Sequence, residues 1–207
     1  IDDTDAIIRR FLVDEEIITI PDYIGELSTN VPWIVRDGGP NFWEQIQFRD
    51  PTPDHLHAVI PGHRFDAVVE RNNDHPIRGR LTDGARAEGW AVYLEEAIMN
   101  AGLLDDKPRV RELIYLFGIF RAARMPADVW LQLNEMTADE VADYWIERVP
   151  YLDRDVARVD AEIYLRRPPG YGLGYTTGML QMQSLLAERK RQLGHAFSLK
   201  EFHDELM

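Results

Sequence analysis

Hydrophobic positions recur at helical spacing near the start of the chain. Ile7, Ile8, Phe11 and Leu12 fall on one face of a helix predicted over residues 1–15. The β-branched run at residues 16–20 follows directly, and it predicts one short strand. The N-terminal segment is therefore expected to be a helix followed by a short β element.

The composition of the chain changes after residue 20. Residues 21–53 are rich in Pro, Gly, Asn and Asp, and they carry several aromatic residues: Trp33, Phe42, Trp43 and Phe48. This composition predicts a structured loop region with at most a short pair of strands.

From residue 54 onward the pattern is helical. Asp83 is a good N-cap and Gly102 a good C-terminal stop, Pro108 suits a first helical turn, and capping boxes begin at Thr137 and Ser198. The predicted helices cover residues 54–72 with an interruption at Pro61-Gly62, 83–100, 108–124, 137–149, 153–166, 176–193 and the end of the chain from 198.

These elements predict a mainly α protein with about seven or eight helices and a short β element near the N-terminus. We expect residues 1–207 to form a single domain, because 207 residues with 45% hydrophobic content can bury one core. Within it, residues 1–53 form the helix, strand and loop region, and residues 54–207 form a helical core.

Charge and composition narrow the classes of partner. A formal net charge of −13 disfavours sequence-independent binding to nucleic acid or to an anionic membrane surface. The chain has no cysteine, which excludes disulfides and thiolate metal sites. No apolar run reaches the roughly 18 residues that span a membrane. We therefore expect a soluble, cytoplasmic protein.

Histidines are concentrated in one place, where His55, His57 and His63 lie within nine residues. On a regular helix the side chains of His57 and His63 would point about 120° apart and could not share a metal ion. Proline breaks the helical ladder and glycine permits unusual backbone angles, so Pro61-Gly62 can bring the second histidine back towards the first.

A second group of polar residues lies in the helix predicted over residues 83–100. Glu88 and Glu95 stand among apolar residues, and buried carboxylates are costly unless they are paired or bind a metal. A cation held by His57, His63 and Glu88 would satisfy this need, with the ligand set of catalytic zinc sites.

Other interpretations of these residues stay open. Glu95 or Asp66 could orient a ligating imidazole. The carboxylates of Glu88 and Glu95 could instead form ion pairs with Arg121 and Arg124, and the histidines could be ordinary helix-face residues.

Further candidates for chemistry lie near the C-terminus. Tyr171 and Tyr175 fall in a glycine-rich segment, and either hydroxyl could donate to a developing oxyanion. Arg166 and Arg167 precede a Pro-Pro-Gly turn and could bind a substrate carboxylate. His55, expected in an exposed position at a helix start, is a further candidate for contact with substrate.

Several motifs in order resemble the C-terminal half of the domain-of-unknown-function 885 family. They are Pro61-Gly62-His63, Glu88-Gly-Trp-Ala-Val-Tyr-Leu-Glu95, Arg121-Ala-Ala-Arg124, Pro169-Gly-Tyr-Gly-Leu-Gly-Tyr175 with Gly178, and Phe202-His203-Asp204. The resemblance covers about residues 50–207. It implies a bacterial, mostly helical, zincin-like metallopeptidase, and a partner that is either a missing N-terminal half or a second chain.

The family's His-Glu-x-x-Pro-Gly-His falls on residues 57–63, and its Glu-Gly-Trp begins at Glu88. The resemblance thus implies that the zinc ligands are present, whereas Ala58 stands where the family has the glutamate that activates water. The family's Asp-Thr-Gly-Leu-His falls on residues 128–132, where Gln132 replaces the histidine. A substitute general base would have to come from the remaining candidates, which are His55, Glu95, Glu96 and His203.

Three functions follow as expectations. The first is a metal-dependent hydrolase, with zinc as cofactor, acting on a peptide-like or small amide substrate. The second is a metal-dependent lyase, hydratase or isomerase, because a metal can polarise a substrate without a glutamate base. The third is an inactive homologue that serves as a binding or structural subunit, with the aromatic loop from Trp33 to Phe48 as its contact region.

Overall fold

The computed structural model describes residues 2–28, 38–80 and 83–207, so Trp33 lies outside the described residues. Within these ranges the protein is helical, as predicted, and contains no strand. The helices are α1 (Asp2–Asp14), α2 (Phe42–Arg49), α3 (Thr52–Ala58), α4 (His63–Arg71), α5 (Gly84–Ala101), α6 (Pro108–Gln132), α7 (Ala138–Arg148), α8 (Arg154–Arg166), α9 (Tyr171–Leu193) and α10 (Leu199–Leu206), with short 3₁₀ segments η1 (Arg78–Arg80) and η2 (Gly194–Ala196).

The predicted strand at residues 16–20 is wrong. Ile17 and Ile18 are buried, but the polar groups of this segment bind α10 instead of a neighbouring strand. His203 Nδ1 donates to the carbonyl of Ile17 at 2.7 Å, and Asp204 accepts from the backbone N–H of Thr19 at 2.8 Å. Side chains from 186 and 185 residues away thus satisfy the backbone groups that a β-ladder would otherwise satisfy.

The loop predicted over residues 21–53 contains a helix, α2. It begins with a capping box, in which the Asn41 side chain accepts from Glu44 N–H and the Glu44 carboxylate accepts from Asn41 N–H, each at 2.8 Å. Two of the aromatic residues expected in a contact region stack on other parts of the chain, the exposed Phe42 on Tyr151 and the partly buried Trp43 on Phe117.

The local sequence signals predicted other helix ends correctly, including both ends of α5. Asp83 accepts from the N–H groups of Ala85 and Arg86 at the start of α5, and Gly102 ends that helix with a positive φ of 112°. Helix α6 continues to Gln132, beyond the expected Arg124, and includes Pro126.

Helix α9 begins at Tyr171, five residues earlier than predicted. Its first N–H groups are capped by Asp128 of α6, whose Oδ2 accepts from Gly172 at 2.8 Å and from Leu173 at 3.4 Å. A cap supplied from 44 residues away leaves no local signal in the sequence.

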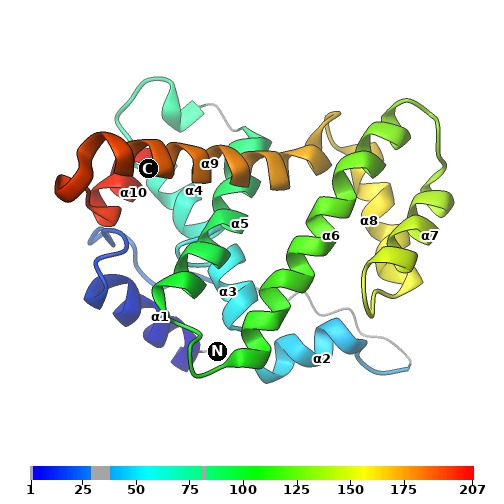
Figure 1. Ribbon diagram of the computed structural model, residues 1–207, viewed down its shortest axis with the longest axis horizontal. Coiled ribbons are helices and arrows are strands. Elements are labelled where there is room, and N and C mark those ends of the chain that lie inside the picture. Colours follow the sequence, from blue (N-terminus) through cyan, green and yellow to red (C-terminus); the bar gives the residue numbers. More distant parts are fainter. Residues whose placement is uncertain (1, 29–37, 81–82) are drawn as a thin grey trace.

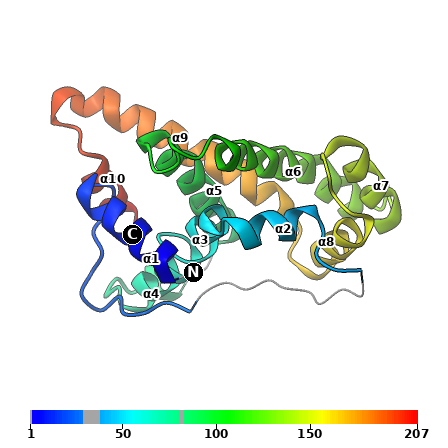
Figure 2. The same cartoon turned by 90° about the horizontal axis from the view of Figure 1, so that it is seen from below.

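The helices are arranged in layers (Figures 1 and 2). Helices α6 and α9 lie on one side, α5 packs beneath α9, and α3, α4 and α1 lie on the far side of α5. One hydrophobic cluster joins α1, α3, α4, α5 and α10, and a second joins α6, α7 and α8. The N-terminal helix therefore shares a core with α5 and does not form a separate unit.

Helices α5 and α9 cross at two glycines. A Cβ placed on Gly89 would lie 2.4 Å from the backbone of Gly178, and a Cβ on Gly178 would lie 2.0 Å from the carbonyl oxygen of Ala85. The close crossing fixes α9 against the segment of α5 that carries Glu88.

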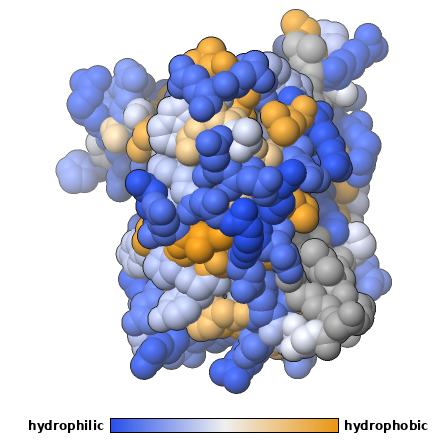
Figure 3. Space-filling model, turned by 90° about the vertical axis from the view of Figure 1, so that its right-hand side faces the viewer, coloured by the Kyte–Doolittle hydropathy of each residue, from blue (hydrophilic) through white to orange (hydrophobic). Residues whose placement is uncertain are grey.

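The end of the molecule formed by α7 and α8 is mostly hydrophilic, with small, separate hydrophobic spots (Figure 3). None of the helices in the described ranges is long and apolar enough to cross a membrane.

Candidate metal centre

The break at Pro61-Gly62 turns the chain back on itself between α3 and α4. Helix α3 ends just after His57, and α4 begins at His63 with Gly62 as its N-cap. A Cβ on Gly62 would lie 1.9 Å from the carbonyl oxygen of His57, so glycine is required at this position. The turn brings the two imidazoles together, with 4.7 Å between ring centroids.

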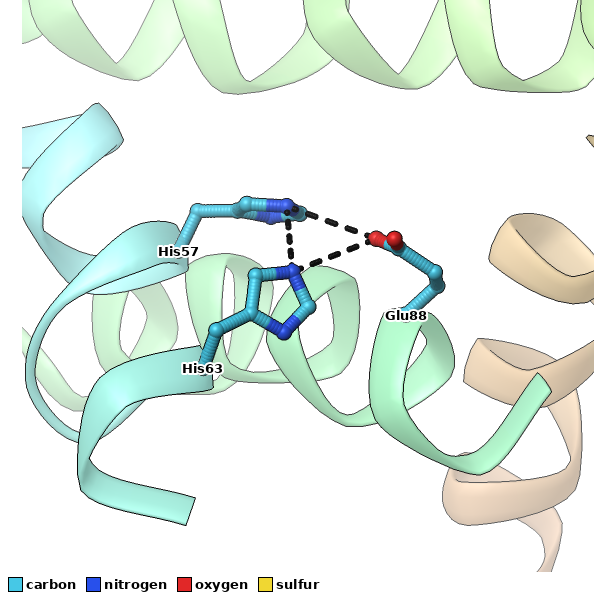
Figure 4. Close-up of side chains that lie close together, drawn as sticks. All are labelled: His57, His63 and Glu88. Atoms are coloured by element: carbon cyan, nitrogen blue, oxygen red, sulfur yellow. Dashed lines mark hydrogen bonds and ion pairs between the residues drawn. The ribbon is translucent and has the colours of Figure 1, made fainter. Parts of the chain in front are cut away.

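Three ligand atoms converge between α3, α4 and α5 (Figure 4). His63 Nε2 lies 3.2 Å from His57 Nε2 and 3.2 Å from Glu88 Oε2, and His57 Nε2 lies 3.7 Å from the same oxygen. Ligands at 2.0–2.1 Å from a tetrahedral zinc ion are separated from one another by about 3.3 Å. The observed separations therefore fit three vertices of a zinc tetrahedron, which leaves the fourth position open.

Glu88 is oriented for this role. Its Oε2 is buried and makes no hydrogen bond with the described residues, whereas its Oε1 accepts from the Tyr171 hydroxyl at 2.6 Å. Burial acts to raise the pKa of Glu88, but the contacts with His57, His63 and Tyr171 outweigh it and hold the pKa well below its usual range. The carboxylate is thus ionised, with one oxygen available for a cation.

Glu95 supports the site from behind His57. It is 1% exposed and accepts from His57 Nδ1 at 2.7 Å. Arg121 of α6 donates to both oxygens of Glu95 at 2.6 Å, and this ion pair outweighs burial and keeps the pKa of Glu95 low. Because an ionised carboxylate only accepts, Nδ1 of His57 carries the proton and Nε2 presents its lone pair to the metal position.

The contacts of His57 also affect its own protonation. Burial and the nearby Arg121 lower the pKa of His57, but the contacts with Glu88 and Glu95 prevail and raise it. Binding of a metal at Nε2 therefore competes with a proton at this atom.

Replacing Arg121 by methionine is expected to weaken zinc affinity by about 10- to 100-fold, the usual effect of losing a group that orients a ligand. The buried Glu95 would lose its counter-charge and no longer hold the imidazole of His57 in one orientation. Affinity is measured by competition with a chromophoric chelator, on protein shown to be folded by circular dichroism.

Arg124 provides the matched control on the same helix. It pairs with Asp160 at 2.9 Å and lies over the rings of Phe120 and Tyr175, so it reaches the ligands only indirectly, through Tyr175 and Tyr171. Arg124→Met should destabilise the fold and reduce zinc affinity much less than Arg121→Met. Equal losses of affinity in both variants would contradict the role assigned to Arg121.

A cavity of about 570 Å³ lies beside the candidate ligands. His63 and Glu88 form part of its wall, Asp83, Gly84, Ala85 and Ala87 line it at the start of α5, and Arg167 to Tyr171 complete the lining. The side chain of His63 is 32% exposed, compared with 16% for His57 and 11% for Glu88. The ligand set is therefore accessible mainly on the side of His63 and the cavity.

The two candidate tyrosines lie near the ligands but at different depths. Tyr171 lines the cavity, and its hydroxyl accepts a hydrogen bond from Tyr175 at 3.2 Å while donating to Glu88. Tyr175 is 9% exposed, and burial raises its pKa. Tyr171 is thus the tyrosine that a substrate could reach.

The two candidate arginines, Arg166 and Arg167, lie in different surroundings. Arg167 lines the cavity, with its guanidinium carbon 5.1 Å from the centroid of the Tyr171 ring. Arg166 has a side chain that is 74% exposed and pairs with Glu162. The structure brings Arg167, and not Arg166, to the cavity.

His55 and His203 are both placed away from the ligand atoms. His55, expected to be exposed, is 3% exposed and bonds through Nε2 to Asp5 of α1 at 2.9 Å. His203 is completely buried, its two ring nitrogens contact Ile17 O and the Tyr93 hydroxyl, and burial lowers its pKa. Both histidines join the N-terminal segment to the core.

The other nominated acids are also engaged elsewhere. Glu96 accepts from Gln183 of α9 at 2.9 Å, and Asp66 pairs with Arg86 at 2.5 Å instead of orienting an imidazole. Ala58 is the last residue of α3, and Gln132 donates to the carbonyl of Tyr164. Among the described residues, none of the four nominated bases reaches the open side of the ligand set.

Sequence reasoning did not assign Asp83 or Asp128 to the site. Asp83 lies on the cavity wall while capping α5, and Asp128 positions Tyr171 by capping α9. Asp83 was identified only as a cap, and the role of Asp128 depends on a contact between two distant helices.

The model of the family described as bacterial protein of unknown function (DUF885) matches residues 55–207. The chain belongs to the DUF885 family. The matched region contains all three ligand residues and the cavity beside them. No curated protein matches the chain.

Two solved structures resemble this DUF885 chain. A candidate lipoprotein from Colwellia psychrerythraea is 29% identical over 73% of the chain, with a TM-score of 0.64. A candidate lipoprotein of unknown function from Shewanella oneidensis is 19% identical over 98% of the chain, with a TM-score of 0.74, and it supports the fold alone. The chain spans 26% and 42% of these two proteins, respectively.

Proposed function

We propose that this chain carries the metal site of a zinc-dependent hydrolase that cleaves a peptide-like or small amide substrate. The observation that supports this function best is the convergence of His57 Nε2, His63 Nε2 and the unbonded Glu88 Oε2 at separations of 3.2–3.7 Å. Two imidazoles and one carboxylate, with one position open, are the donor set of many catalytic zinc sites.

Each residue of the site has a defined task in such a reaction. When bound, zinc supplies Lewis acidity, which polarises a carbonyl group and lowers the pKa of water to about 7. Glu95 and Arg121 fix the imidazole of His57, and Tyr171 fixes the carboxylate of Glu88. In amide hydrolysis the oxygen of water bonds to the carbonyl carbon, the C–N bond breaks, and a proton passes to the leaving amine.

Tyr171 is suited to a second task at the cavity wall. Its hydroxyl donates to Glu88 in the structure, and it accepts from Tyr175. If the hydroxyl turns towards a bound substrate, it can donate to the oxyanion that develops on the carbonyl oxygen, with Tyr175 as its supporting partner.

A second candidate function arises from Ala58. A site with metal ligands and no glutamate beside His57 suits a lyase, hydratase or isomerase, in which polarisation of the substrate replaces activation of water. The ligand geometry is the same for both functions, so the reaction products distinguish them.

The partners are proposed on the same basis. The solved relatives are much longer, so a further part of the protein, in the same or a second chain, is proposed to cover the substrate. The cytoplasmic location and the absence of nucleic-acid and membrane partners stay predictions.

The function is tested by incubating the purified chain with short peptides and N-acyl amino acids, before and after treatment with a chelator. We expect slow hydrolysis that the chelator abolishes and that added zinc restores. Hydrolysis that is insensitive to the chelator would contradict the proposal. Metal-dependent conversion without cleavage would favour the second candidate, and protein that binds zinc without any turnover would favour a binding subunit.

A further inference from the structure

The cavity beside the ligands has an uneven distribution of charge. Of its lining residues, Glu88 faces the metal position, and Asp83 accepts from backbone N–H groups at the start of α5. The fixed cation on the wall is Arg167, which lies where α8 ends. The same cavity is thus bordered by two of the candidate metal ligands and by a guanidinium.

Arg167 has no carboxylate partner among the described residues. In a chain with 36 acidic and 23 basic side chains, many of its other described arginines pair with an acid, among them Arg86, Arg121 and Arg124. The neighbouring Arg166 shows the contrast, because it pairs with Glu162 at 3.1 Å. An unpaired guanidinium on a cavity wall is available to an anionic group of a ligand.

The position of Arg167 is constrained by its surroundings. Its N–H donates to the carbonyl of Ile163 at the end of α8, and Pro168 and Pro169 fix the backbone that follows. Its guanidinium lies over the ring of Tyr171, the residue whose hydroxyl bonds to Glu88. One aromatic ring therefore separates the cation from the metal ligand.

The separation between the metal position and Arg167 suits a short substrate. Extended peptide advances about 3.3–3.6 Å per residue, so one or two residues can reach from the metal position past the Tyr171 ring. A cavity of about 570 Å³ falls within the usual range for sites that bind small molecules. Because the net charge of −13 repels carboxylates in general, a local cation is needed to hold one here.

The geometry points to a substrate whose amine product carries a free carboxylate, that is, an N-acyl amino acid or a short peptide. Its C-terminal carboxylate binds Arg167 while the carbonyl group of the cleaved amide lies at the metal position. This inference rests on the proposed function. It adds the class of substrate, and it assigns the recognition of that class to Arg167.

Binding to metal-free protein tests the inference without relying on catalysis. Benzoyl-glycyl-phenylalanine and its C-terminal carboxamide are titrated by calorimetry into chelator-treated wild type, Arg167→Ala and Arg166→Ala. We expect wild type and Arg166→Ala to prefer the free acid by about tenfold, the effect of a charge-assisted hydrogen bond at an exposed site. Arg167→Ala should bind both compounds equally, and Arg167→Lys should recover part of the preference.

Several results would overturn the inference: equal binding of acid and amide to wild type, a preference that survives in Arg167→Ala, an equal loss in Arg166→Ala, or no binding of either compound. The zinc-loaded protein gives the parallel kinetic readout, where Arg167→Ala should raise KM for the acid and leave kcat nearly unchanged. Failure of hydrolysis with an intact preference in binding would reject the proposed function and keep the carboxylate site.

Discussion

Replacing Ala58 by glutamate is expected to raise the rate of amide hydrolysis by about 10²- to 10⁴-fold, the usual contribution of a general base. Residue 58 directly follows the candidate ligand His57 and is the last residue of α3. In the structure the other nominated bases are engaged elsewhere: His55 with Asp5, Glu95 with Arg121, Glu96 with Gln183 and His203 with Ile17. A carboxylate at position 58 would supply the missing group.

Ala58→Gln is the matched control, because it has nearly the size of glutamate and cannot act as a base. Rates are compared as kcat/KM on one N-acyl amino acid at equal zinc occupancy. If Ala58→Glu and Ala58→Gln behave like wild type while wild type hydrolyses the substrate, the base lies elsewhere. If only a non-hydrolytic reaction is observed in all three proteins, the second candidate function is favoured.

Replacing Glu88 by glutamine is expected to abolish stoichiometric zinc binding, from about one ion per chain to a trace. The substitution preserves the shape of the side chain and removes its charge, so the two imidazoles would remain as the strong ligands. Oε2 of Glu88 is buried 3.2 Å from His63 Nε2, and an amide at this place lacks the negative charge that the carboxylate offers to a divalent cation. Metal content is measured by mass spectrometry after exhaustive dialysis.

His63→Ala should lose zinc in the same way, and His195→Ala provides the control. His195 is exposed in η2, away from the ligand set, so its loss should leave the metal content unchanged. Retention of stoichiometric zinc in both Glu88→Gln and His63→Ala would reject the metal site, provided that both variants keep the circular dichroism spectrum of wild type.

The sequence predicted the helical class and most helix ends, because these depend on short-range chemistry. The caps at Asp83, Thr137 and Ser198 bond to N–H groups two or three residues away, and Gly102 ends its helix through its own φ. The start of α2 had a local signal as well, the capping box of Asn41 and Glu44, which the loop-like composition of residues 21–53 obscured.

The wrong strand at residues 16–20 and the wrong start of α9 share one physical cause, which is a bonding partner from a distant part of the chain. Ile17 resembled a strand residue because its β-branched neighbours favour extended backbone, yet its carbonyl binds His203. Likewise, α9 begins early because Asp128 caps it. His203, one of the residues proposed as a base, bonds in the structure to Ile17 and Tyr93 and links the N-terminal segment to the core.

For the candidate site, the sequence by itself determined the residue types and the need for a break between the histidines. Spacing showed that His57 and His63 could meet only if Pro61-Gly62 turned the chain, and burial of Glu88 and Glu95 followed from their apolar neighbours. The sequence proposed Glu88 as the ligand and left open ion pairs of Glu88 and Glu95 with Arg121 and Arg124. Only the tertiary structure decided between these, since α6 brings Arg121 to Glu95, whereas Glu88 contacts His63 and Tyr171. Hydrophobic spacing and helix capping depend on residues that are close in the sequence. The partner of a buried charge depends instead on which helices pack against it.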